Sequence, residues 1–125
     1  MTAIAGIWTY DTGGDCKQRC ERMLQAQQVY APERPQVWDG ECVAVGRRLF
    51  RSLPEDRFDR APIVGGAGVL VADIRLDNRD ELGAALSIST AELRECSDSE
   101  LLMRALAAWG ERAVHRLIGD FAFAW

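Results

Sequence analysis

Cysteine and histidine are the first side chains to consider for chemistry, because they act as nucleophiles, bases and metal ligands. The chain has four cysteines and a single histidine, His115. Cys16 and Cys20 share one face of a predicted helix, whereas zinc sites prefer closer pairs on a turn. His115 has no partner in sequence for a catalytic pair, and we place it on a helix surface. We therefore expect no metal site and interpret all the cysteines as free thiols: Cys16, Cys20, Cys42 and Cys96.

The other candidate for chemistry is Thr2, which follows Met1 and leads into the apolar run AIAGIW. Residues 4–8 predict a buried strand, so the Thr2 hydroxyl stands at the start of a structural element. No leader with a basic and an apolar region is visible, and no apolar run reaches the about 20 residues that a membrane span needs. We therefore expect a cytoplasmic protein with no membrane partner. The residue types alone leave open whether Thr2 has a chemical role.

The remaining pattern predicts an α+β fold with mostly antiparallel strands and helices packed on the sheets. Asp15 is a suitable N-cap for a helix that ends before Pro32, and Gly13-Gly14 closes the turn in front of it. Strands and hairpins are predicted next, and the final GDFAFAW alternates aromatic and alanine residues as a strand does. The hairpin turns fall at Asp39-Gly40 and Gly65-Gly66, and the strongest strand covers residues 69–76.

Capping residues predict two further helices. Asn78 precedes Glu81 by three positions, and Ser97 stands in the same relation to Glu100, as in a capping box. Gly110 is a suitable residue to end the second of these helices. The stretch that follows it, ERAVHRLIG, predicts a short helix before the last strand.

Composition narrows the classes of function. The chain has 125 residues, of which 48% are hydrophobic and 27% charged, with a net charge of -4. This is enough chain for one domain with a real core. The acidic balance and the scattered arginines argue against nucleic acid as a partner. The chain stops within the last predicted strand, which favours a domain taken from a longer protein.

Four stretches in their order resemble the N-terminal glutaminase domain of the asparagine synthetase family, a class II glutamine amidotransferase: IAGIW, LVADIRLDNRDEL, SDSELLMRALAAWG and GDFAFAW. Two stretches are most similar to the sequences of the cyclases that close the macrolactam ring of lasso peptides: VGRRLFRSLPEDRFDRAPIVGG and LDNRDEL. The resemblance implies an N-terminal-nucleophile hydrolase fold, a four-layer sandwich with two mostly antiparallel sheets between helices. It also implies that residues 1–125 form a single domain at the N-terminus of a longer asparagine-synthetase-like protein.

The resemblance assigns site positions one by one. In the family, the residue exposed by methionine removal is a cysteine nucleophile whose own α-amine acts as base, and Thr2 holds that position here. Arg48 matches the arginine before leucine that binds the glutamine carboxylate. Asp98, in the run SDSE, matches the aspartate that binds the glutamine ammonium. Asp73 and Ile74 stand where the asparagine and glycine of the oxyanion hole would be.

The sequence departs from the family where the chemistry would occur. A threonine hydroxyl is a weaker nucleophile than a thiolate, and an ionised Asp73 accepts hydrogen bonds where the oxyanion needs donors. Ile74 resists the positive φ that glycine permits. Loss of one oxyanion donor costs about 100- to 1000-fold in rate. We therefore interpret Thr2, Asp73 and Ile74 as remnants of a glutaminase site.

Two functions follow from these departures. In the first, a degenerate glutaminase domain has a structural role toward a synthetase domain, and Arg48 and Asp98 make structural contacts. Ring closure by an amine of the substrate itself, as in a lasso peptide cyclase, needs no ammonia. The alternative is an active amidotransferase domain of an asparagine synthetase, with Thr2 as the N-terminal nucleophile. A stand-alone binding protein is a third possibility.

Cofactors and partners differ little between the first two readings. No cofactor is expected in this domain, because ATP and Mg²⁺ belong to the synthetase domain that the resemblance implies. The expected partners are that C-terminal synthetase domain and, in a lasso-type enzyme, a precursor peptide.

Overall fold

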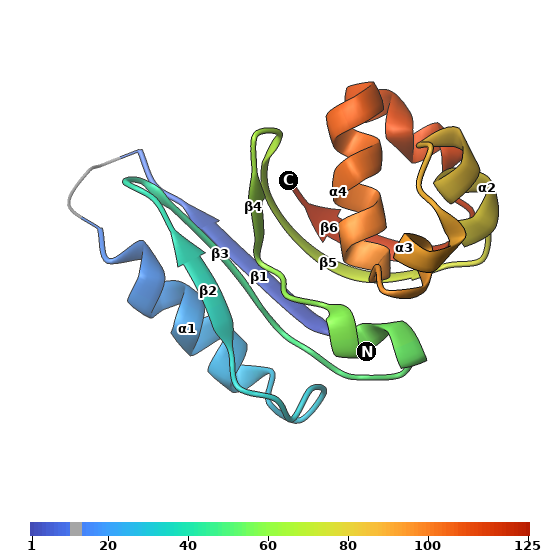
Figure 1. Cartoon of the computed structure of the whole chain (residues 1–125). Coiled ribbons are helices and arrows are strands. Elements are labelled where there is room, and N and C mark those ends of the chain that lie inside the picture. Colours follow the sequence, from blue (N-terminus) through green and yellow to red (C-terminus); the bar gives the residue numbers. More distant parts are fainter. Residues whose placement is uncertain (11–13) are drawn as a thin grey trace.

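The computed structural model describes residues 1–10 and 14–125, and it contains two antiparallel three-stranded sheets with helices packed on them (Figure 1). This confirms the α+β class predicted from the sequence. The turn predicted at Gly13-Gly14 lies partly outside the described residues. Helix α1 and helices α2–α4 lie on opposite outer sides of the two sheets in Figure 1.

The first sheet has the strand order β1-β3-β2, with β1 over Ala3–Trp8, β2 over Gln36–Asp39 and β3 over Val43–Arg48. Helix α1 (Cys16–Ala26) packs on it. The Asp15 side chain accepts a hydrogen bond from the Gln18 backbone N–H at 2.9 Å, which confirms the predicted N-cap. The buried side chains between helix and sheet are Cys16, Cys20, Leu24, Ala5 and Ala44.

The second sheet has the order β4-β5-β6, with β4 over Ile63–Gly65, β5 over Gly68–Leu76 and β6 over Gly119–Ala124. The larger core lies between this sheet and the helices α2 (Arg79–Ala85), α3 (Thr90–Arg94) and α4 (Asp98–Trp109). Two 3₁₀ helices, η1 (Pro54–Phe58) and η2 (Gly110–Arg116), connect these elements. No helix in the described part of the chain is long and apolar enough to cross a bilayer.

Strand β5 lies between the helices and the first sheet. Leu70, Ala72 and Leu76 point into the helical core. Successive side chains of a strand point to opposite faces, so Asp73 and Arg75 point to the other side. Strands β1 and β3 contact β5, so these polar side chains face the region of the first sheet.

The two helix starts for which a capping box is predicted behave differently. Ser97 accepts from the Glu100 N–H at 3.2 Å, as its position predicts. Asn78 stands at the N-cap of α2 but makes no cap hydrogen bond. Its side chain instead donates to the Arg116 carbonyl at 2.9 Å and accepts from the Ile118 N–H at 3.0 Å. The capping box predicted there is therefore wrong, because contacts far along the chain occupy the amide.

Helix α3 was not predicted, although its signal is present in the sequence. Ser89 stands three residues before Glu92, the same spacing that predicts the start of α4. The Ser89 hydroxyl accepts from the Glu92 N–H at 3.2 Å. The helix covers only five residues, Thr90–Arg94, which is too short to show an apolar period.

Candidate functional site

Thr2 joins the two sheets at the start of the chain. It lies just before β1 and is 7% exposed. Its backbone N–H donates to Asp73 Oδ1 on β5 at 2.9 Å. Its hydroxyl accepts a hydrogen bond from the Phe50 N–H, just after β3, at 3.1 Å. The structure thus brings together Thr2 and Asp73, which lie 71 positions apart in the sequence.

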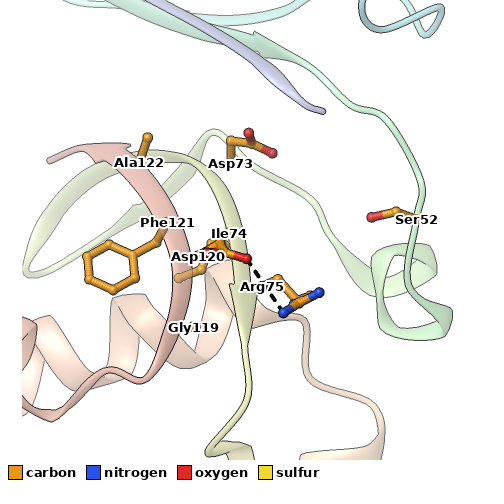
Figure 2. Close-up of a pocket in the computed structure, with 8 residues that line it drawn as sticks. All are labelled: Ser52, Asp73, Ile74, Arg75, Gly119, Asp120, Phe121 and Ala122. Carbon is orange, nitrogen blue, oxygen red and sulfur yellow. Dashed lines mark ion pairs between the residues drawn. The ribbon is translucent and has the colours of Figure 1, made fainter.

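Thr2 and Asp73 line one cavity of about 300 Å³. A second cavity, of about 570 Å³, shares Asp73 and Ala122 with it (Figure 2). Asp73 lies opposite Ala122 in the register of β5 and β6, and both side chains project to the same side in Figure 2. The first cavity is lined by Met1, Thr2, Ala3, Ile4, Gln27, Tyr30, Asp73 and Ala122.

The two predicted oxyanion positions lie inside a regular strand. Asp73 pairs with Ala122 and Ile74 pairs with Phe121. In the described residues, Ser87 is the one residue other than glycine with a positive φ, so Ile74 does not adopt the conformation that a glycine would allow. Asp73 accepts the hydrogen bond from Thr2, and a carboxylate in this role supplies no donor to an anion.

Arg48 is not among the residues that line this cavity. Its Nε donates to the Ala31 carbonyl at 2.8 Å, and its Nη atoms lie 3.4 Å from the Pro32 carbonyl and from Gln25 Oε1. Ala3 is directly opposite Arg48, so these two side chains share a face of the sheet. The alternation along β1 then puts Thr2 on the other face. Arg48 holds the loop after α1, and its role in binding a carboxylate stays a prediction.

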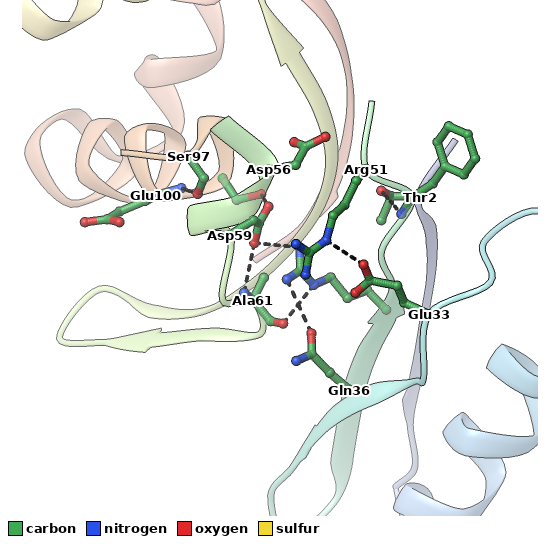
Figure 3. A network of polar contacts seen from close by, with 12 residues as sticks. Thr2, Glu33, Gln36, Arg51, Asp56, Asp59, Ala61, Ser97 and Glu100 are labelled. Atoms are coloured by element: carbon green, nitrogen blue, oxygen red, sulfur yellow. Dashed lines mark hydrogen bonds and ion pairs between the residues drawn. The ribbon is translucent and has the colours of Figure 1, made fainter. Parts of the chain in front are cut away.

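The neighbouring Arg47 was missed by the sequence reasoning, although it is fully buried. Its Nη1 lies 2.6 Å from Asp59 Oδ1, and its Nε donates to the Ala61 carbonyl at 2.8 Å. Ser99 Oγ donates to the other oxygen of Asp59 at 2.8 Å. The guanidinium Nη2 donates to Gln36 Oε1 at 3.4 Å, and Figure 3 labels the three partners Asp59, Ala61 and Gln36. Burial lowers the pKa of Arg47, and Asp59 opposes that shift. The sequence did hold a signal for this buried arginine. Two consecutive arginines in a strand point to opposite faces of the sheet, so one of them must face the interior.

Asp98 is 2% exposed at the start of α4. One carboxylate oxygen accepts from the Leu76 N–H at 2.7 Å, and the other forms an ion pair with Arg79. Arg79 also donates to the Leu93 and Cys96 carbonyls, at 2.9 and 2.7 Å. Burial raises the pKa of Asp98 in spite of these donors. Asp98 does not line either cavity at Asp73, and its role in binding an ammonium stays a prediction.

The cysteines are free, and none lines the cavity at Thr2. Cys16, Cys20 and Cys96 are buried and Cys42 is half-buried. Burial raises the pKa of the Cys20 thiol and raises that of Cys96 to about 11. Thiols of this kind are poor nucleophiles at neutral pH.

Comparison with known proteins identifies the family. No curated protein matches the chain. The family described as the glutamine amidotransferase domain matches residues 1–125, which is the whole chain. This chain therefore belongs to the class II glutamine amidotransferase domains.

Proposed function

We propose that this domain no longer hydrolyses glutamine and has a structural role toward an ATP-dependent synthetase domain of the same protein. The observation that carries the proposal is the 2.9 Å hydrogen bond from the Thr2 backbone nitrogen to Asp73 Oδ1. The resemblance assigns an oxyanion donor to the position of Asp73, and the hydrogen bond supports a carboxylate beside Thr2 instead. Thr2 itself replaces the family's cysteine.

The charge of Asp73 opposes two steps of glutamine hydrolysis. When Thr2 is the first residue, its nitrogen is an α-amine, and a carboxylate beside it favours the protonated form. An ammonium cannot take the proton of the hydroxyl, so the nucleophile is not activated. The same negative charge disfavours the oxyanion that forms when the amide is attacked.

The groups predicted to hold glutamine have internal partners. Asp98 is paired with Arg79 and accepts from the Leu76 N–H, so its charge is already matched inside the fold. The Arg48 Nε donates to a backbone carbonyl at 2.8 Å. Binding of an amino acid by either group would require exchange of these buried contacts, and each exchange has a cost in free energy. This supports the structural reading of both residues.

The parent enzyme is proposed from the resemblance. The residues of VGRRLFRSLPEDRFDRAPIVGG and LDNRDEL favour an asparagine-synthetase-like cyclase that closes the ring of a lasso peptide. In such a reaction the synthetase domain uses ATP and Mg²⁺ to activate a carboxylate, and an amine of the same peptide attacks it. No ammonia is needed, which makes glutamine hydrolysis dispensable. A cytoplasmic location is part of this proposal.

The N-terminal-nucleophile hydrolase fold is proposed on two grounds. The chain belongs to the class II glutamine amidotransferase domains. Its two antiparallel sheets have helices on their outer sides, as a four-layer sandwich would (Figure 1).

The test is a glutaminase assay on a chain whose first residue is Thr2. We expect no release of ammonia above that of a matched Thr2→Ala chain, and at most weak heat of glutamine binding in calorimetry. Ammonia release that disappears in Thr2→Ala would contradict the proposal. It would favour the alternative, an active amidotransferase domain of an asparagine synthetase with Thr2 as nucleophile.

A further inference from the structure

We propose that the cavity beside Thr2 binds a primary ammonium group carried on a small apolar body, with Asp73 as its counter-ion. The inference rests on the proposed loss of glutamine hydrolysis, because an ammonium and an oxyanion require opposite charges at the same place. It goes beyond the proposed function because it assigns to the cavity a class of ligand, primary ammonium compounds.

The lining of the cavity fits such a ligand. Of its eight lining residues, Asp73 alone has a charged side chain. Ala3, Ile4 and Ala122 supply apolar walls, and the volume of about 300 Å³ is at the small end for ligand pockets. Gln27 and Tyr30 each have an oxygen that can accept a further hydrogen bond from an ammonium.

The charge of Asp73 has no cationic partner in the described part of the chain. One oxygen accepts from the neutral amide of Thr2. Arg75, two residues along the same face of β5, lies 3.4 Å from Asp77 and 3.5 Å from Asp120 instead. A partly buried carboxylate without a counter-ion is a favourable site for a cation.

The start of the chain can compete for this site. When the chain begins at Met1, the Thr2 nitrogen is an amide and leaves the charge of Asp73 unmatched. When it begins at Thr2, the same nitrogen becomes an ammonium beside the carboxylate. We therefore expect the shorter chain to bind an external ammonium less tightly.

The test is an NMR titration of the full chain with L-leucinamide at about pH 6.5, below the α-amine pKa of about 8. We expect shifts of the Thr2, Asp73 and Ala122 amides, and none with the uncharged N-acetyl-leucinamide. Asp73→Asn should weaken binding about 10- to 100-fold, the loss of one charge-assisted hydrogen bond. Asp120→Asn removes the same charge from the neighbouring strand and should bind as the parent chain does.

Equal binding of the acetylated probe, or equal affinity in Asp73→Asn, would overturn the inference. In Asp73→Asn the asparagine keeps an oxygen that can accept the hydrogen bond from Thr2. The chain that begins at Thr2 tests the site with no substitution, and its affinity for leucinamide should be about tenfold lower. Tighter binding of the tripeptide amide Leu-Ala-Ala than of leucinamide would identify a peptide N-terminus as the source of the ammonium, and equal binding a free amine. Ammonia release from glutamine is a separate readout, so failure of the proposed function is distinguishable from failure of this site.

Discussion

Two acidic side chains carry the proposed loss of glutamine hydrolysis. The resemblance implies an uncharged oxyanion donor at the position of Asp73, and in the structure Asp73 accepts a hydrogen bond from the Thr2 backbone N–H at 2.9 Å. The buried charge of Asp98, by contrast, is matched by the cation of Arg79. The sequence revealed both positions through the resemblance. It could not reveal Arg79 as the partner of Asp98, because that contact depends on how α2 and α4 meet.

The buried thiols permit a prediction at the residue scale. Cys96 has a pKa raised from 9.0 to about 11, so at pH 8 it holds about 100-fold less thiolate than an ordinary cysteine. Cys42 is half-buried and should react first with an aromatic disulfide reagent. The labelling rate of Cys96 in the folded protein should keep rising with pH beyond 9. Mass spectrometry of the labelled sites checks the order, with the unfolded chain in urea as control, and rapid labelling of folded Cys96 at pH 8 would contradict it.

Most elements that local residues determine were predicted, with helix α3 as the exception. Asp15 and Ser97 cap their helices through N–H groups three residues ahead, and such contacts can be read from spacing alone. Asn78 shows the limit, because its side chain bonds to residues 38 and 40 positions away. The meeting of Thr2 with Asp73 was likewise beyond local patterns, since it depends on how the two sheets lie together. The resemblance identified Thr2 and Asp73 as site positions, but only the structure shows that they form a hydrogen bond.

Gly119 supports a prediction at the scale of the element. It begins β6 opposite Leu76 with a φ of +144°, and a Cβ there would overlap the Arg75 carbonyl oxygen. Gly119→Ala should therefore lower the free energy of unfolding by about 2 to 5 kcal/mol, from backbone strain and overlap together. Gly66→Ala is the matched control, because a Cβ at Gly66 meets nothing within 4 Å. It should change stability by less than about 1 kcal/mol. Urea denaturation of both variants checks the difference, and equal losses would contradict it.

A buried polar network joins the two halves of the molecule, in addition to the contact of Thr2 with Asp73. Arg47 comes from β3 of the first sheet, Asp59 from the segment that leads into β4, and Ser99 from α4 of the helical layer. The sequence gives no local signal for this network, because its members are polar or charged side chains that lie far apart along the chain. Burial of an ion pair carries a large desolvation cost. Removal of one partner leaves the other charge buried and unpaired, so it lowers stability far more than the same removal from an exposed pair.

Two ion pairs of equal length test this reasoning. Arg47–Asp59 and Arg51–Glu33 both have a nitrogen–oxygen distance of 2.6 Å, but the side chains are 0% and 6% exposed in the first pair and 56% and 38% in the second. Arg47→Met should lower the free energy of unfolding by about 3 to 5 kcal/mol, because Asp59 keeps a buried charge without its cation. Arg51→Met should lower it by about 1 kcal/mol or less. In the double variant Arg47→Met/Asp59→Leu, removal of the orphaned charge should recover part of the loss. Denaturation with urea compares the three variants, and similar losses for Arg47→Met and Arg51→Met would show that burial does not make the Arg47–Asp59 pair costlier to break.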